Sequence, residues 1–289
     1  MNDSARRFLL EDLDIRGSIL RLGAVWQKLL AGRNYPAPVI DALGQMVAIT
    51  GLLADNLKQP GRLTAQLHGS GPISRLVVDC DCNRQMNLRC MAHHAERITA
   101  APVSKLFGHG QLLLSLETHD RREPYQSIVP LEGETVAEIF EHYLQASEQV
   151  ESRFFLAASP LGVAGMHLQK MPAADQRDAD GWTRATALAA TVKPEELLGL
   201  NGKKLLRRLF HEETLSLFDL RPLTHDFPPD PDKVRIMLLA LGREDVYANL
   251  GRHGVIVVRD ELSNHEYRFA KRDIDEMFAR TPETPKSVH

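Results

Sequence analysis

The feature that most constrains the fold is one long amphipathic helix with short alternating segments on either side of it. Over positions 39–57 the side chains that repeat at intervals of four and three residues fall on one helical face. They are Val39, Leu43, Met46, Thr50, Leu53 and Leu57. A helix with one apolar face has to bury that face against another layer, so we expect the N-terminal part of the chain to fold around it.

Residues 63–67 and 73–80 alternate between apolar and polar side chains, and the turn Gly69-Ser70-Gly71-Pro72 between them predicts a β-hairpin. Similar runs predict further strands near 8–10, 15–22, 87–92, 111–117, 125–130, 152–157 and 163–169. A second amphipathic helix is predicted at 136–144, and a shorter one at 25–30. Strands and helices alternate without a regular βαβ repeat, which indicates an α+β fold for residues 1–173.

The small, acidic stretch 173–181 is typical of a boundary between domains. Residues 182–221 are interpreted as short helices, at 185–190, 194–198 and 203–210. Three prolines within 228–231 then separate a last small unit, with a helix at 234–241, paired strands at 255–258 and 267–269, and a closing helix from 272. The predicted division is an α+β core domain at 1–173, a helical linker at 174–222 and a small α+β domain at 223–289.

Charge and hydropathy exclude several classes of protein. The chain has 35 Lys and Arg against 38 Asp and Glu, a net charge of -3, which gives no global basic field for nucleic acid. We find no apolar run near the roughly 18–20 residues that span a bilayer, and the N-terminus has acids where a signal peptide needs an apolar core. We therefore expect a cytoplasmic protein with neither nucleic acid nor membrane as partner.

The three cysteines, Cys80, Cys82 and Cys90, lie within eleven residues and are odd in number, which favours reduced thiols over a disulfide framework. With His93 and His94 they offer ligands to a soft metal, although a Cys-x-Cys pair strains a tetrahedral site. Three interpretations stay open: buried structural thiols, a redox-responsive thiol set, and a metal site.

Common signatures of enzymes do not occur in the sequence. There is no complete phosphate-binding loop, no G-x-S-x-G elbow and no H-E-x-x-H zinc motif. We therefore do not expect an enzyme, and no catalytic residue is assigned.

Several motifs in register resemble those of the 33 kDa heat-shock chaperonin family, the redox-regulated holdases of bacteria. The resemblance covers nearly the whole chain. It is carried by residues 6–8, 14–17, 35–38, 71–72, 125–134, 147–149 and 205–213. It implies an α+β core domain, a helical linker and a small C-terminal domain, the same division that the residue patterns suggest.

The chain departs from this family at the zinc site. Family members bind zinc through four cysteines of the last domain, and alignment places Phe227, Pro229, Asp260 and Ser263 at those positions. Phe and Pro side chains cannot ligate zinc, so we expect no metal and no cofactor. The nearby Asp230, Asp232, His225 and His265 leave open a harder oxygen and nitrogen site with Asp260, against a solvated acidic turn.

The resemblance implies an ATP-independent holdase whose partners are unfolded or oxidatively damaged proteins, with a homodimer in the active state. Because the zinc ligands are absent, we expect the zinc-thiol switch to be lost. The candidate client-binding residues are Leu197, Leu198, Leu205, Leu206, Leu209 and Phe210, which alternatively only dock the linker on the core domain. Two other hypotheses are a thiol redox sensor that uses Cys80, Cys82 and Cys90, and an inactive relative that acts as a partner or decoy.

Overall fold

The computed structural model describes residues 3–121, 123–250 and 254–279. The chain divides into two compact units, Met1–Asp226 and Phe227–His289. We describe each unit by itself.

The first unit is built on a ten-stranded sheet in the order β7-β6-β3-β4-β5-β10-β1-β2-β9-β8. The strands are β1 (Ser4–Leu10), β2 (Ile15–Leu22), β3 (Gly61–Gly69), β4 (Ile73–Asp81), β5 (Met86–His94), β6 (Gly110–Thr118), β7 (Tyr125–Pro130), β8 (Ser152–Ser159), β9 (Gly162–Lys170) and β10 (Leu215–Thr224). Neighbours are antiparallel except β10 and β5, which pair in parallel through Leu223 and Thr224. The predicted hairpin is confirmed as β3 and β4.

Helix α2 (Ala37–Asp55) is the predicted long helix, and it lies between the two halves of this sheet. It contacts β2, β8 and β9 on one side and β3, β4 and β5 on the other. Its residues join the larger apolar core with α1 (Ala24–Leu30) and α4 (Val136–Glu148). The remaining helices of this unit are η1 (Glu11–Leu13), α3 (Val103–Phe107), α5 (Ala174–Arg177), α6 (Gly181–Ala190), α7 (Pro194–Gly199) and α8 (Gly202–Leu209).

The same helix corrects one expectation from the sequence. By length and composition α2 passes the test for a membrane span, with a mean hydropathy of 1.5, so an apolar run of that length does exist. In this fold 67% of this apolar stretch is buried inside the protein. Core helices of folded domains commonly pass the test, so α2 is weak evidence for a membrane.

The predicted linker lies inside the first unit. Its helical part is α5 to α8, but residues 215–224 form strand β10 instead of a helix, and β10 pairs with β1 from Leu215 to Pro222. Alternation at the start of the strand, with half-buried Leu215 and Leu217 facing the apolar cluster, stabilises it as a strand. The unit therefore ends at Asp226, a few residues beyond the predicted limit at 222.

The second unit has a small α+β core. It comprises α9 (Pro231–Leu241), α10 (Arg243–Ala248), β11 (Val255–Asp260), β12 (His265–Ala270) and α11 (Lys271–Ala279). The predicted pairing of two strands is confirmed by β11 and β12, which run antiparallel from Val255 opposite Ala270 to Asp260 opposite His265. The core is formed by Val234, Leu238, Val246, Ile256, Tyr267, Phe269, Ile274 and Met277.

Candidate functional site

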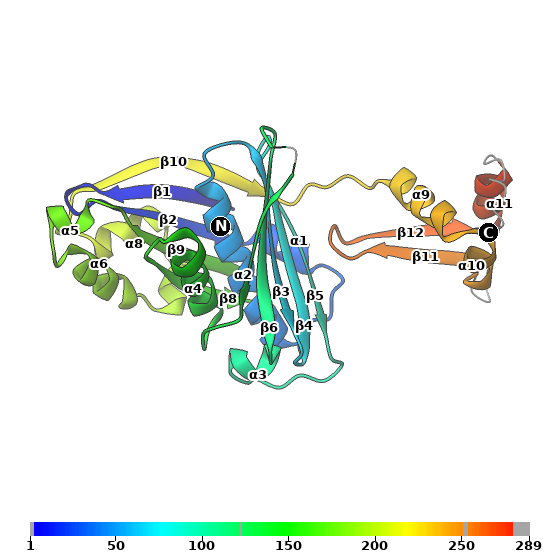
Figure 1. Ribbon diagram of the computed structural model, residues 1–289, viewed down its shortest axis with the longest axis horizontal. Helices are drawn as coiled ribbons and strands as arrows, with labels where there is room; N and C mark the ends of the chain where they lie inside the picture. The colour runs from blue at the N-terminus through cyan, green and yellow to red at the C-terminus, as the bar shows by residue number, and fades with distance from the viewer. Residues whose placement is uncertain (1–2, 122, 251–253, 280–289) are drawn as a thin grey trace. The chain divides into compact units, whose positions relative to one another are not determined.

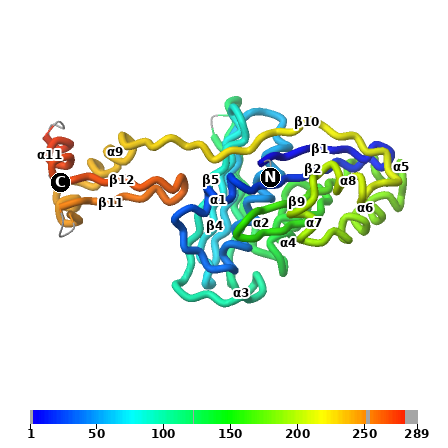
Figure 2. Tube along the Cα trace, turned by 180° about the vertical axis from the view of Figure 1, so that it is seen from behind, coloured from blue at the N-terminus to red at the C-terminus, as the bar shows by residue number. Residues whose placement is uncertain are grey.

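Helices α6, α7 and α8, which we call the helical segment, cover one face of strands β1, β2, β9 and β8 (Figures 1 and 2). Side chains from both layers form one continuous apolar cluster, the docking interface. The strand side includes Phe8, Leu10, Ile15, Ile19, Ala164, Met166 and Leu168, and the helix side includes Trp182, Ala185, Ala189, Leu197, Leu205, Leu206, Leu209 and Phe210. The interface is therefore a large apolar surface that the helical segment covers.

The sequence of α8 explains why it docks with one face. Leu205, Leu206 and Leu209 are buried, while the lysines and arginines of the same helix face solvent. Helix α8 begins at a defined cap. The Asn201 side chain accepts a hydrogen bond from the amide of Lys203 at 3.0 Å, which satisfies an amide that the first helical turn leaves unpaired.

The centre of the docking interface depends on a glycine in β2. Gly17 lies opposite Phe8, and a Cβ at Gly17 would come within 2.1 Å of the Phe8 ring. Any larger residue would displace that ring. Phe8 in turn packs against Phe210 of the helical segment with ring centroids 6.0 Å apart. A residue in the 14–17 motif therefore shapes the surface on which the helical segment docks.

Polar contacts surround the docking interface. Arg208 pairs with Glu196 at 2.5 Å and joins α8 to α7. Arg184 of α6 pairs with Glu213 at 2.9 Å. Exposed ion pairs stabilise weakly, by about 0–1 kcal/mol each. The apolar contacts therefore hold the helical segment in place, and the ion pairs add little.

Five of the six candidate client-binding residues are almost completely buried in the docking interface. Leu205 and Leu206 are 0% exposed, Leu197 and Phe210 are 1% exposed, and Leu209 is 6% exposed. Leu198 is half-buried at the edge of the same cluster. The structure thus brings these residues together, and in this state it covers them.

Strand β10 adds an exposed apolar surface that the sequence analysis missed. Phe218 and Leu220 are each 50% exposed. Leu220 lines a cleft of about 680 Å³ together with Arg6, Arg21 and Lys203. Because residues 215–221 were interpreted as helix, their alternation was not used, although it was the available signal.

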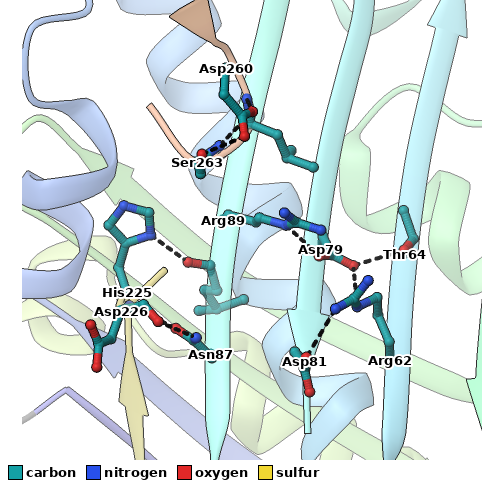
Figure 3. A network of polar contacts seen from close by, with 12 residues as sticks. Arg62, Thr64, Asp79, Asp81, Asn87, Arg89, His225, Asp226, Asp260 and Ser263 are labelled. Carbon is teal, nitrogen blue, oxygen red and sulfur yellow. Dashed lines mark hydrogen bonds and ion pairs between the residues drawn. The ribbon is translucent and has the colours of Figure 1, made fainter. Parts of the chain in front are cut away.

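Hydrogen bonds to β5 hold the chain just after the end of β10 (Figure 3). Asp226 is tied back to β5, because its amide donates to the Asn87 side chain at 2.8 Å and its carbonyl accepts from the same side chain at 2.8 Å. In the neighbouring strands Asp79, 1% exposed, pairs with Arg89 at 2.6 Å and accepts from Thr64 at 2.9 Å. The strand that follows the helical segment is therefore anchored at its far end.

The three cysteines lie in the first unit and are buried. The Sγ atoms of Cys80 and Cys82 are 3.6 Å apart. This hydrogen bond, and then burial, raise the pKa of Cys80 well above its usual value, and burial raises the pKa of Cys90 to about 12. Hydrogen bonding to Cys80 lowers the pKa of Cys82. Because the thiolate is the reactive form, Cys82 is the one candidate for redox chemistry among them.

Two of the positions aligned with zinc ligands hydrogen-bond to each other in the turn between β11 and β12 (Figure 3). The Ser263 hydroxyl donates to Asp260 at 2.6 Å, and the amides of Leu262 and Ser263 donate to the same carboxylate. At a third position the carbonyl of Phe227 accepts from His265 at 2.5 Å. The side chains of Phe227 and Pro229 offer no metal ligand, so these residues do not fit a zinc ion.

The other residues considered for a harder metal site have separate partners. Asp230 caps α9 by accepting from the amide of Lys233 at 3.0 Å, and Asp232 pairs with Arg235 at 2.8 Å. His225 bonds to the carbonyl of Leu88 at 2.7 Å. Within residues 3–121, 123–250 and 254–279, no group of three or more His, Cys, Asp and Glu side chains is placed to hold a metal ion.

Comparison with known proteins gives a consistent result. Residues 3–270 match the family described as "Hsp33 protein". The chain is 36% identical over 280 residues to the 33 kDa chaperonin of Methylobacillus flagellatus, covering 96% of this chain and 95% of the relative. It is 37% identical over 286 residues to the 33 kDa chaperonin of Ectopseudomonas mendocina, covering 96% of each. The crystal structure of the 33 kDa chaperonin from Thermotoga maritima superimposes with a TM-score of 0.80 at 19% identity, covering 96% of this chain and 98% of that one.

Proposed function

The chain belongs to the Hsp33 family, and on that premise we propose that it is an ATP-independent holdase whose zinc-thiol redox switch has been lost. Its relatives bear the name 33 kDa chaperonin, so its function is that of a chaperone and not of an enzyme. In this proposal it binds unfolded or oxidatively damaged proteins in the cytoplasm, acts as a homodimer when active, and requires neither nucleic acid nor membrane.

The observation that carries the proposal is the docking interface. A holdase needs apolar surface for unfolding chains and a polar surround that keeps the complex soluble. Release of the helical segment would expose Leu205, Leu206 and Phe210 together with the strand face that carries Phe8 and Met166. The lysines and arginines on the outer face of α8 would supply the polar surround.

The energetics favour reversible release of the helical segment. Burying one leucine fully contributes about 1.5–3 kcal/mol, whereas ordering each residue of backbone costs about 1–2 kcal/mol. The docked state therefore depends on a small difference between large opposing terms. Local and sub-global opening of proteins spans free energies from near zero up to that of global unfolding. Heat or other unfolding stress can then act as the trigger without any metal.

The absence of the family's zinc ligands supports a switch that does not use zinc. Structural zinc contributes on the order of 10 kcal/mol to folding of a small domain, and here hydrogen bonds at Asp260 and Phe227 occupy the corresponding positions. Oxidation has no zinc-bound thiolates to attack there. We therefore expect activation to be independent of oxidant.

A thiol sensor remains the second hypothesis, and the lowered pKa of Cys82 beside Cys80 is the observation in its favour. Against it, Cys80 and Cys90 are 0% exposed and their thiols are held protonated. Replacing all three cysteines by alanine tests it directly. Unchanged suppression of client aggregation, with and without oxidant, would exclude it.

The first experiment heats a thermolabile client with stoichiometric amounts of the reduced, chelator-treated protein and follows light scattering, with bound zinc assayed on the same sample. We expect suppressed scattering from zinc-free, reduced protein. Suppression that appears only after oxidation would overturn thiol-independent activation. An absence of suppression under any stress would indicate an inactive relative.

A reversible lock tests whether release of the helical segment is the active step. A Cβ built on Gly202 lies 3.3 Å from Cγ2 of Ile19 across the docking interface, close to the geometry that a disulfide needs. Ile19→Cys with Gly202→Cys, in a background that lacks the natural cysteines, should lose activity when oxidised and regain it with reductant. Gly202→Cys alone is the matched control and should stay active throughout. Equal activity of locked and reduced protein would contradict the proposal.

A further inference from the structure

A second cavity of the first unit lies on the opposite side of the sheet from the docking interface. It has a volume of about 260 Å³ and is partly open to solvent. Strands β2, β8 and β9 form its floor, the end of α2 and the helix α4 cover it, and β3 and β6 close one side. Its polar side is lined by Arg16, Asn56, Ser152, His167 and Gln169.

The register of three neighbouring strands places the polar residues of this cavity side by side. Arg16 of β2 lies opposite Gln169 of β9, which lies opposite Ser152 of β8. His167 lies two residues before Gln169 in the same strand, so its side chain points to the same face. These side chains are deeply placed, since Ser152 and His167 are each 2% exposed.

Four residues that line this cavity each carry one deeply buried polar atom without a hydrogen-bond partner: Arg16 Nε, Asn56 Oδ1, Ser152 Oγ and His167 Nε2. A buried polar group without a partner costs about 1–3 kcal/mol, and native proteins keep few of them. Four around one cavity indicate that an occupant supplies the missing partners.

The opposite walls are apolar. They are formed by Leu53, Leu57, Leu63, Leu114, Leu116 and Leu144. A water molecule needs two to four polar partners to be held in a cavity, and leucine walls offer none. Water alone therefore suits the polar floor but leaves the rest of the space unfilled. An occupant with one polar end and an apolar body suits both.

The charges indicate the nature of the polar end. Arg16 donates through Nη2 to Gln169 at 2.5 Å and keeps Nε free. Burial, and then the charge of Arg7, lower the pKa of Arg16, and no carboxylate acts on it in the opposite direction. The acid that lines the cavity, Glu148, instead accepts from the hydroxyls of Tyr125 at 3.3 Å and Tyr143 at 3.1 Å. The floor therefore presents an unpaired cation with neighbouring donors.

The cavity has a route to solvent. Asn56, Leu57, Leu116, Tyr125 and Glu148 also line an outer cleft of about 610 Å³. Tyr125 is 40% exposed. A small molecule can thus reach the cavity without release of the helical segment.

We propose that this cavity binds a small amphiphilic carboxylate, with the carboxylate at Arg16 and Ser152 and the hydrocarbon chain against the leucines. His167 Nε2 completes the donors to the carboxylate, and a bridging water or a ligand hydroxyl serves Asn56 Oδ1. Because drug-sized ligands need about 300–1,000 Å³, the cavity suits a short chain of about eight carbons. The site is separate from the docking interface and does not depend on the holdase proposal.

The test measures binding of octanoate to the full-length reduced protein by calorimetry and by methyl NMR of the leucines, below the concentration at which octanoate forms micelles. Octylamine and 1-octanol are the charge controls. We expect octanoate to bind at least tenfold more tightly than 1-octanol, with octylamine weakest, and to perturb the leucines of this cavity. Equal binding of all three compounds, or no binding of octanoate, would overturn the proposal.

Binding measurements on variants distinguish a specific carboxylate site from nonspecific binding of alkyl chains to the protein. Arg16→Gln should weaken octanoate binding at least tenfold and leave 1-octanol binding unchanged. Arg153→Gln is the matched control, because it removes one arginine from strand β8, at a position that does not line the cavity. Should Arg16→Gln fail to fold, Ser152→Ala removes a hydroxyl that has no partner in the protein and should weaken binding several-fold. Unchanged octanoate binding in whichever of these two variants folds would refute the proposal that Arg16 and Ser152 bind the carboxylate.

Discussion

The docking interface and the C-terminal unit differ in how completely they bury their apolar residues. In the docking interface Leu205 and Leu206 are 0% exposed, and so is Phe8 on the strand side. In the C-terminal unit Ile274 alone among the described core residues reaches 0%, and α9 leaves Ile236 69% exposed. The segment whose release is proposed to activate the protein is thus the better packed of the two.

This difference in burial predicts which region of the protein stress should unfold first. Small units bury a smaller fraction of their surface on folding and are marginally stable without metals or disulfides. The C-terminal unit has hydrogen bonds at Asp260 and Ser263, two positions that the sequence resemblance aligns with zinc ligands, whereas the helical segment shares a core with strands of the ten-stranded sheet. We therefore expect the C-terminal unit to unfold at lower stress than the helical segment. The following predictions test that order.

The largest effect is expected from Phe210→Ala, which opens a cavity beside Phe8 in the docking interface. It should lower the free energy of unfolding of the first unit by about 3–5 kcal/mol and raise hydrogen exchange first in residues 181–209. Denaturant titration and exchange measured by mass spectrometry check it. Phe218→Ala, at a position 50% exposed, is the control. Equal losses in both variants would mean that the docking interface is not well packed.

A comparable truncation in the C-terminal unit should have a more local result. Ile274→Ala should cost about 2–5 kcal/mol, enough to unfold a marginal unit while the first unit keeps its melting temperature. NMR signals of Tyr267 and calorimetry report the two units separately. Ile236→Ala, at an exposed position of α9, should change stability by less than about 0.5 kcal/mol. A single transition that shifts as a whole would contradict independent unfolding.

Acid is expected to weaken the first unit through His167, whose pKa is lowered to about 3 by burial and then by Arg16. The native imidazole stays neutral while the unfolded chain takes up a proton below its ordinary pKa of 6.5. Stability is therefore lost as pH falls from 6.5 toward 3, by about 1.4 kcal/mol per pH unit and about 2 kcal/mol at pH 5.

Denaturant titrations of the wild type and His167→Gln between pH 7 and pH 5 check this prediction. The variant should lose this part of the pH dependence, because glutamine does not titrate. His119→Gln, at an exposed position, should follow the wild type. Parallel curves for the wild type and His167→Gln would show that His167 does not contribute to acid sensitivity.

The smallest effect is expected at the turn between β11 and β12, where the sequence resemblance aligns two residues with zinc ligands. Asp260→Ala removes the acceptor of three hydrogen bonds and should cost about 1–3 kcal/mol in the C-terminal unit. Glu244→Ala, an exposed acid in α10, is the control. A chelator should leave the melting temperature of the wild type unchanged. A shift on adding the chelator would show that a metal stabilises this unit after all.

Periodicity in the sequence predicted most elements, because the spacing of apolar side chains depends on local backbone geometry. The helix at 37–55, the hairpin at 61–81 and the strands at 255–270 follow from it. Strand β10 was missed, since its alternation is short and it is stabilised by β1 and β5, which are remote in the chain. Pairing with distant strands overrode what the local pattern suggested.

By itself the sequence determined the family, the α+β character of the fold and the absence of the four zinc-binding cysteines, because these depend on which residues occur and how they are spaced. Only the tertiary structure decided that Leu205 and Phe210 lie buried over Phe8, and that Arg16, Ser152 and His167 share one cavity. Such contacts join residues far apart in the chain, and strand register determines which side chains meet.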